Sequence, residues 1–92
     1  MSMTEQSEQG EDLKQHKLET LIALIREQVM HSLGAPDNLI RVQVRRLWKN
    51  YYRVNIFVGA DATSARIANS YFLQADSDGN IVQSIPKITK HY

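Results

Sequence analysis

Hydrophobic residues recur at spacings of three and four in the first third of the chain. The stripe consists of Leu18, Ile22, Ile25, Val29 and Leu33, with Leu21 beside it. This spacing places apolar side chains on one face of an α-helix. Gly34 can adopt the left-handed conformation that ends helices, and Pro36 prevents the helix from continuing. The pattern predicts one amphipathic helix over residues 12–33.

The hydrophobic period changes to two after a turn at residues 35–38, which is typical of β-strands. The first predicted strand has Ile40, Val42 and Val44 on one face and Arg41, Gln43 and Arg45 on the other. The second predicted strand, residues 51–58, has Tyr52, Val54, Ile56 and Val58 on one face and Tyr51, Arg53, Asn55 and Phe57 on the other. We expect the two strands to form a hairpin whose aliphatic face meets the helix.

The register of this hairpin leaves two alternatives. A two-residue turn over residues 49–50, continued strictly, would place Arg45 on the buried face. A β-bulge at Arg45-Arg46 corrects this, as does a three-residue loop over residues 48–50 with Asn50 left-handed. The loop turns Arg46 toward the inner side at the sheet end. Both alternatives pair Val44 with Val54, Val42 with Ile56 and Ile40 with Val58.

Two further strands complete the pattern, after a loop at residues 59–65. Ile67, Tyr71, Leu73 and Ala75 alternate with Ala68, Ser70, Phe72 and Gln74. A helix capped by Asp61 also fits the alanine spacing, so residues 62–69 stay open between strand and short helix, and we favour the strand. Residues 76–80 predict a tight turn, residues 81–85 a returning strand, and Pro86 its end.

The element order α-β-β-β-β with short connections predicts a two-layer α+β fold. In it, one amphipathic helix packs on an antiparallel meander sheet. Residues 1–11 are polar and are expected to form a disordered tail. Residues 12–86 form the single domain, and residues 87–92 a short basic tail that we expect to be loose.

The composition narrows the class of protein. The 92 residues include no cysteine, so a disulfide framework and a cysteine-based zinc site are impossible. No apolar run approaches the ~20 residues of a membrane-spanning helix, and the N-terminus lacks the pattern of a signal peptide. We therefore expect a cytoplasmic protein without a membrane partner.

The charge is divided unevenly along the chain. Residues 1–38 carry three basic and seven acidic side chains, whereas residues 39–66 carry six basic and one acidic. Such a division is typical of an electrostatic binding face. The alternative is that an acidic helix and a basic sheet neutralise each other within one fold.

Motifs for catalysis are absent from the sequence. It has no nucleophile elbow, Walker loop, dinucleotide fingerprint or metalloprotease motif, and its three histidines are scattered. Residues 76–80 resemble the start of a calcium loop, but no carboxylate follows to complete it, and a tight turn explains the same residues. We expect no enzymatic activity, no catalytic residue, no metal and no small-molecule cofactor.

The outer face of the predicted hairpin is the best candidate for function. Arginines there can attract phosphates or carboxylates, and exposed aromatic rings can stack on bases or anchor a protein contact. The candidate binding residues are Arg41, Gln43, Arg45, Trp48, Tyr51, Arg53, Asn55, Phe57, Arg66 and Phe72. We expect a small binding module that contacts another protein or a second copy of itself. The alternative is sequence-tolerant binding of single-stranded nucleic acid.

Overall fold

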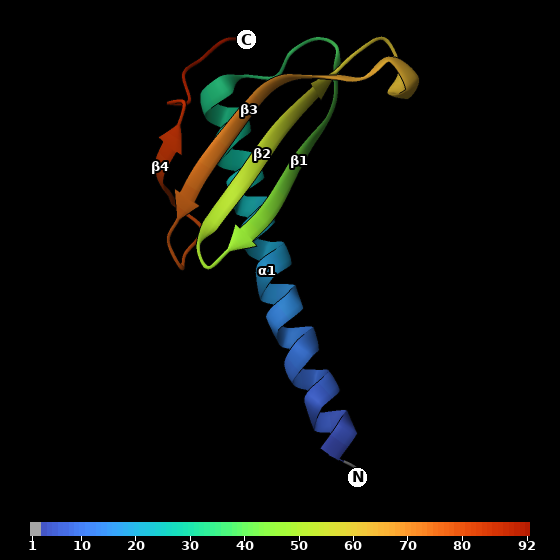
Figure 1. The fold of residues 1–92 in the computed structure, drawn as a ribbon, viewed down its shortest axis with the longest axis vertical. Coiled ribbons are helices and arrows are strands. Elements are labelled where there is room, and N and C mark those ends of the chain that lie inside the picture. Colours follow the sequence, from blue (N-terminus) through green and yellow to red (C-terminus); the bar gives the residue numbers. More distant parts are fainter. Residues whose placement is uncertain (1–2) are drawn as a thin grey trace.

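One helix crosses one face of a four-stranded antiparallel sheet in the computed structural model of the chain (Figure 1). The structure describes the backbone of residues 3–92 and the side chains of residues 16–92. The elements are α1 (Met3–Leu33), β1 (Leu39–Trp48), β2 (Tyr51–Val58), the short 3-10 helix η1 (Ala62–Ser64), β3 (Arg66–Ala75) and β4 (Ile81–Ile85). The strands follow one another in the order β1-β2-β3-β4. The predicted two-layer α+β meander is confirmed.

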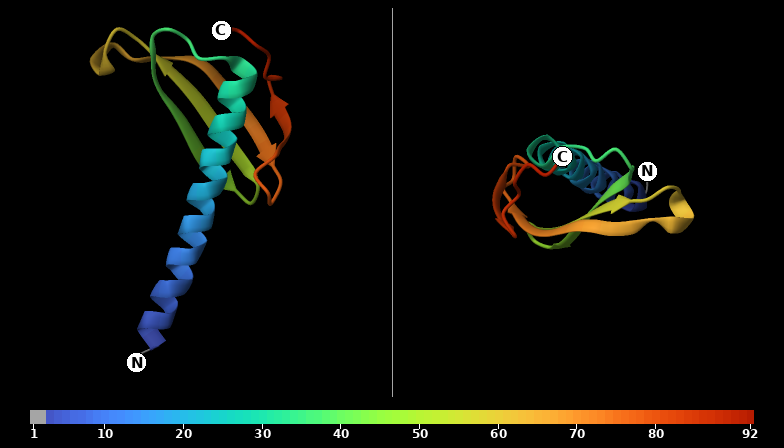
Figure 2. Two further views of the ribbon diagram at one scale, coloured as in Figure 1. Left: turned by 180° about the vertical axis from the view of Figure 1, so that it is seen from behind. Right: turned by 90° about the horizontal axis from the view of Figure 1, so that it is seen from above.

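The helix α1 begins at Met3, earlier than the predicted start at residue 12. Glutamate and glutamine dominate the added segment and have high helix propensity, which a search for apolar periodicity does not register. The side chains of residues 1–15 lie outside the described part, and the disorder expected for residues 1–11 stays a prediction. Seen from behind and from above, α1 lies against the concave side of a curved sheet (Figure 2).

The core lies between the apolar stripe of α1 and the inner face of the sheet. The helix contributes Ile25, Val29 and Leu33, all fully buried. The sheet contributes Val44, Tyr52, Val54, Ile56, Val58, Tyr71, Leu73 and Ala75. Within residues 16–92 no polar or charged residue is buried. The helix is therefore attached to the sheet by hydrophobic burial.

Two polar side chains of α1 reach toward the edges of the sheet. Arg26 Nε donates to the carbonyl oxygen of Val42 in the edge strand β1, at 3.4 Å. On the other side, Gln28 Nε2 donates to the carbonyl oxygen of Gly79, and Gln28 Oε1 accepts from the backbone N–H of Ile81 at 3.2 Å. These bonds fix the helix laterally between β1 and β4.

The β1–β2 hairpin confirms the predicted pairing of Val44 with Val54 and of Val42 with Ile56. The predicted pair of Ile40 with Val58 is wrong, because Leu39 opposes Val58 and the register shifts at this point. The shift occurs at the start of β1, directly after the turn at residues 35–38. At this point β1 contains one residue more than the paired part of β2.

The turn of this hairpin differs from both predicted alternatives. Residues 49–50 form a two-residue turn, with Lys49 rather than Asn50 at positive φ (48°), and the bulge lies between Arg46 and Trp48. Arg46 consequently opposes Tyr52 on the inner side of the sheet end. Its side chain is exposed there, and Arg46 Nε donates to the carbonyl oxygen of Lys49 at 2.7 Å. The end of the sheet thus admits an arginine that the core would exclude.

Residues 62–69, left open between strand and short helix, contain both: residues 62–64 form η1, and β3 begins at Arg66. Asp61 caps η1 by accepting the backbone N–H groups of Thr63 and Ser64. A register shift between the partners of Ile56 and Phe57 then places Ile67 opposite Phe57. Ile67 is 51% exposed, so the expectation that it shares the buried face with Tyr71 is wrong.

The C-terminal segment is attached to the end of α1, although the sequence led us to expect a loose tail. The backbone N–H groups of His91 and Tyr92 both donate to the carbonyl oxygen of Leu33, at 2.9 and 3.0 Å. Gly34 has a φ of 86°, and a Cβ atom there would lie 2.6 Å from the carbonyl carbon of Tyr92. Glycine at this position therefore serves both the helix end and the close approach of the tail.

The predicted turn at residues 76–80 is confirmed. Asp76 accepts hydrogen bonds from the backbone N–H groups of Asp78 and Asn80, each at 2.9 Å. These bonds hold the pKa of the Asp76 carboxyl below its ordinary value of 3.8, and the bond from the backbone of Asn80 contributes most. The Asp76 carboxylate therefore accepts its hydrogen bonds from within the turn that it begins.

We predict that Leu73→Ala lowers the free energy of unfolding by about 2–5 kcal/mol, because Leu73 is fully buried in a central strand. Urea denaturation followed by circular dichroism measures the change. The matched control is Val82→Ala in the edge strand, where the side chain is 57% exposed. A control variant destabilised as much as Leu73→Ala would contradict the placement of the core.

We predict that Asp76→Ala lowers stability at neutral pH and that this difference narrows in acid. Because the folded-state pKa is lowered, the stabilisation is present above pH 3.8 and is lost as the pH falls through the folded-state value. Urea midpoints of both proteins, measured from pH 7 downward, test this. A constant difference at every pH would show that the ionised carboxylate does not stabilise the turn.

Candidate binding surface

The outer face of the sheet, which points away from α1, is organised in rows by the strand register. Along the sheet the rows are Arg41–Phe57–Ile67, Gln43–Asn55–Ser70, Arg45–Arg53–Phe72–Ile85 and Trp48–Tyr51–Gln74–Gln83. Each row arises because alternate residues of paired strands point to the same side. Side chains from all four strands therefore meet on one continuous surface.

Three aromatic rings form a cluster at the hairpin end of this face. The ring centroids of Trp48 and Tyr51 are 5.4 Å apart, and those of Tyr51 and Phe72 are 5.6 Å apart with an interplanar angle of 21°. Trp48 and Phe72 are separated by 6.1 Å. Trp48 is 54% exposed, and Ile85, which opposes Phe72, is 60% exposed. The aromatic cluster and Ile85 together make an apolar patch that water reaches.

A polar row lies beside the aromatic cluster. Asn55 Nδ2 donates to Gln43 Oε1 at 3.2 Å, and Ser70 Oγ donates to Asn55 Oδ1 at 2.7 Å. Arg53 Nη1 donates to Ser70 Oγ at 3.3 Å. The Asn55 amide is thus occupied on both sides by neighbouring side chains, so it holds the row together rather than reaching outward.

The charge on this face has one sign. The sequences of the four strands contain no aspartate or glutamate, whereas β1 contributes Arg41 and Arg45 to this face and β2 contributes Arg53. Arg41 lies over the ring of Phe57, 4.7 Å from its centroid. Arg45 and Arg53 are directly opposite each other, an arrangement of like charges that destabilises a sheet.

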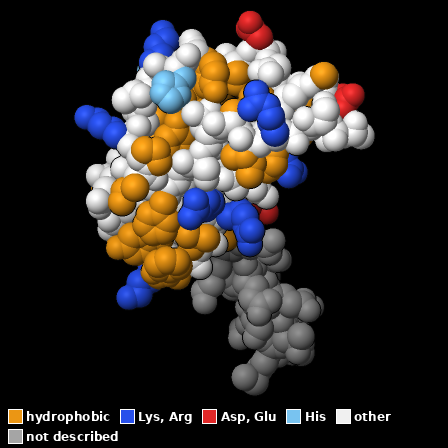
Figure 3. All heavy atoms as spheres, turned by 45° about the horizontal axis from the view of Figure 1, so that its top comes forward, with side chains coloured by type: hydrophobic (Ala, Val, Ile, Leu, Met, Phe, Trp, Pro, Cys, Tyr) orange, Lys and Arg blue, Asp and Glu red, His pale blue; other side chains and the backbone are white. Residues whose placement is uncertain are grey.

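A view onto this side of the molecule shows the same distribution (Figure 3). Hydrophobic side chains gather toward the hairpin end of the sheet, lysine and arginine side chains lie beside them, and acidic side chains appear toward the margins. The apolar patch is therefore bordered by cations. A carboxylate-bearing surface with apolar residues at its centre would complement it.

The structure brings nearly all the predicted site residues together. Nine share the outer face: Arg41, Gln43, Arg45, Trp48, Tyr51, Arg53, Asn55, Phe57 and Phe72. Arg66 instead opposes Val58, at the far end of the sheet from the aromatic cluster. Ile67 and Ile85 extend the apolar part of the face and were not predicted. Their placement depends on register shifts in β3 and β4, which the sequence pattern alone does not locate.

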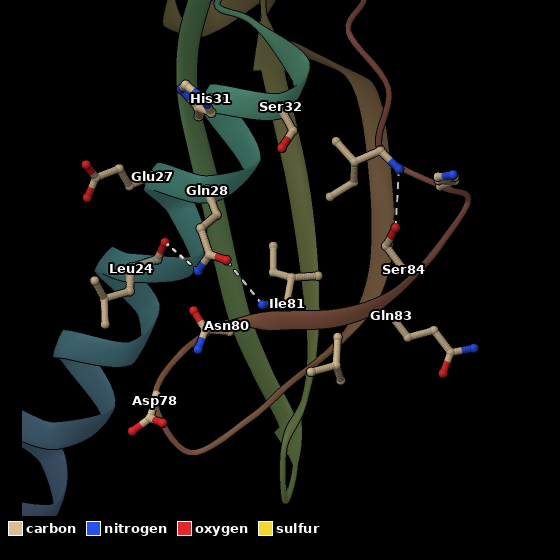
Figure 4. Close-up of a pocket in the computed structure, with 13 residues that line it drawn as sticks. Leu24, Glu27, Gln28, His31, Ser32, Asp78, Asn80, Ile81, Gln83 and Ser84 are labelled. Carbon is tan, nitrogen blue, oxygen red and sulfur yellow. Dashed lines mark hydrogen bonds between the residues drawn. The ribbon is translucent and has the colours of Figure 1, made fainter.

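A groove of about 780 Å³ lies between α1 and β4 (Figure 4). Gln28 spans it to the backbone of Ile81, and Glu27, His31 and Asp78 line its rim. Among the described side chains, no hydrogen bond joins two titratable groups of this groove.

Neither a metal-binding cluster nor a membrane-spanning helix is found among residues 16–92. No group of three or more histidine, aspartate or glutamate side chains there is placed to hold a metal ion. No helix of the described chain is long and apolar enough to cross a membrane. The outer face of the sheet is therefore the strongest candidate site on the described surface.

We predict that Phe72→Ala shifts the fluorescence emission of Trp48 to longer wavelength and raises its acrylamide quenching constant. Trp48 is the only tryptophan of the chain and packs 6.1 Å from Phe72. Phe57→Ala is the matched control, because Phe57 lies in a different row, against Arg41. Equal effects of both substitutions would contradict the existence of a distinct aromatic cluster.

Comparisons with protein-family models, with curated proteins and with solved structures find no match to this chain. The chemistry of the outer face is therefore the basis on which its function is inferred. That chemistry consists of an exposed aromatic cluster, a self-contained polar row and arginines without acidic neighbours in the strands.

Proposed function

We propose that this chain is a small binding module whose outer sheet face docks another protein that presents carboxylates around an apolar centre. The observation that carries the proposal is the partly exposed cluster of Trp48, Tyr51 and Phe72, which is bordered by Arg45 and Arg53. Tryptophan, tyrosine and arginine are the residues most enriched at energetic hot spots of protein interfaces. The proposed role is non-enzymatic.

The arrangement of the rings favours a protein partner over stacked bases. The rings of Tyr51 and Phe72 are stacked on each other, so fewer ring faces are free for bases to stack on. Packed rings offer an apolar surface with little side-chain entropy left to lose, which suits an anchor for a partner's aliphatic side chain. The Asn55 amide is likewise occupied and is not available to a base edge.

A contact between two outer faces is disfavoured by charge. In a two-fold symmetric contact the same patch lies on both sides, so Arg45 and Arg53 of one copy would approach those of the other. The strands supply no carboxylate to separate them. Like charges juxtaposed across an interface cost several kcal/mol. The favoured partner surface is therefore a different one, with acidic residues.

Single-stranded nucleic acid is a second candidate, favoured by the arginines of the strands and their lack of acidic neighbours. Phosphate contacts would dominate such binding, because neutralising phosphates releases counterions. The two candidates therefore differ in their dependence on salt and on the aromatic cluster.

We predict that Arg53→Glu weakens binding of a protein partner at least about 10-fold, because it opposes the partner's carboxylates at the centre of the face. Proteins that the immobilised wild-type chain retains from a cell extract are first purified. Calorimetric titration then measures their binding to the wild type and to Arg53→Glu. The matched control is Lys87→Glu, which reverses a positive charge in the same way at an exposed position outside this face.

The proposal is wrong if the same partners bind Arg53→Glu and the wild type with equal dissociation constants. Fluorescence anisotropy with an oligothymidylate tests the second candidate. Binding at about 50 mM salt that falls steeply as salt rises, and that is lost in Arg53→Glu, would favour nucleic acid. No binding at low salt would exclude it.

A further inference from the structure

Within residues 16–92, acidic and basic side chains do not meet in the buried interface between the helix and the sheet. The helix α1 packs its apolar stripe on the inner face, where no charged residue is buried within residues 16–92. The arginines Arg41, Arg45 and Arg53 lie on the outer face, on the other side of the sheet. The basic face is therefore left for an acidic group from elsewhere.

The N-terminal segment of the chain has the chemistry that this face would take. Residues 1–15, MSMTEQSEQGEDLKQ, contain four acidic residues and a single basic one, Lys14. They also include apolar residues, such as Met3 and Leu13, that could contact aromatic rings. No 15-residue stretch after residue 15 contains more than two acidic residues.

The topology prevents this segment from reaching the outer face of its own chain. Lys17 and Leu18 already lie at the end of the sheet, beside Arg46 and Lys49 of the hairpin. The helix α1 continues without interruption back to Met3 and leads away from the sheet (Figure 1). A helix of this length spans roughly 46 Å, so a return would require breaking α1. If this segment occupies an outer face, it is therefore the outer face of a second copy.

We propose that residues 1–15 of one copy dock on the outer face of another, with their carboxylates against Arg45 and Arg53 and their apolar residues on the aromatic cluster. This inference rests on the proposed function and names its partner as the chain itself. It joins unlike surfaces, so it avoids the repulsion that disfavours contact between two outer faces. It also accounts for the uneven charge of the sequence.

Sedimentation velocity of the full chain tests the proposal. We expect the weight-average mass of the wild type to rise between about 1 µM and 1 mM, and the dissociation constant to increase at least about 10-fold in high salt, which screens charge pairs. A triple variant with Glu5→Gln, Glu8→Gln and Glu11→Gln retains helix propensity. It should raise the dissociation constant by a similar factor. The matched control changes the same residue type on the described part of α1, Glu19→Gln with Glu27→Gln, and should associate like the wild type.

A charge exchange makes the test specific for this contact. A variant with Glu8→Lys and Glu11→Lys and a second variant with Arg45→Glu and Arg53→Glu should each be monomeric. Their mixture should associate again, with the emission of Trp48 shifted to shorter wavelength as the aromatic cluster is covered. A wild type that is monomeric at about 1 mM, or a Glu→Gln variant that associates like the wild type, would overturn the inference.

Failure of this inference is distinguishable from failure of the proposed function. If the wild type is monomeric but binds an acidic protein, and Arg53→Glu abolishes that binding, the proposed function stands. Only the inference that the partner is a second copy is then wrong. If Arg53→Glu changes neither self-association nor any protein contact, the outer face is not a docking surface and both proposals are wrong.

Discussion

The alternation of side chains along β2 is the constraint on which the rest of the structure depends. This strand pairs on both sides, and its residues point inward at Tyr52, Val54, Ile56 and Val58 and outward at the positions between them. The neighbouring strands keep their apolar residues in line with β2 by local shifts of register. Such shifts maintain two chemically distinct faces in a sheet whose strands do not alternate perfectly.

The sequence predicts those parts of the fold that depend on local periodicity. The helical stripe, the four strands and the orientation of most outward-facing residues follow from spacing alone. The positions of the bulges do not, because each depends on the partner strand: Ile67 turns outward only through the shift opposite Phe57. The contact between Tyr92 and Gly34 cannot be predicted from local periodicity either, because it joins segments far apart in the sequence. For the same reason, Ile85 could not be assigned to the candidate site in advance.

The two faces of the sheet have different physical roles. The inner face excludes charge, and its hydrophobic contacts with α1 are non-directional. The outer face retains a pair of opposed arginines, Arg45 and Arg53, that does not stabilise the fold. In the proposed docking function, this pair and the neighbouring aromatic rings would contact the partner. The polar row around Asn55 then keeps the face ordered without a partner.

The two hydrogen-bonded side chains of α1 have a consequence for colloidal behaviour. A meander sheet has two edges, and a strand with free backbone groups can template the addition of strands from other molecules. Arg26 occupies a carbonyl oxygen of the β1 edge, and Gln28 occupies the amide and carbonyl groups that begin the β4 edge. Pro86, directly after β4, has no N–H to offer. The helix that builds the core thus also occupies some of the edge groups through which a strand of another molecule could add to the sheet.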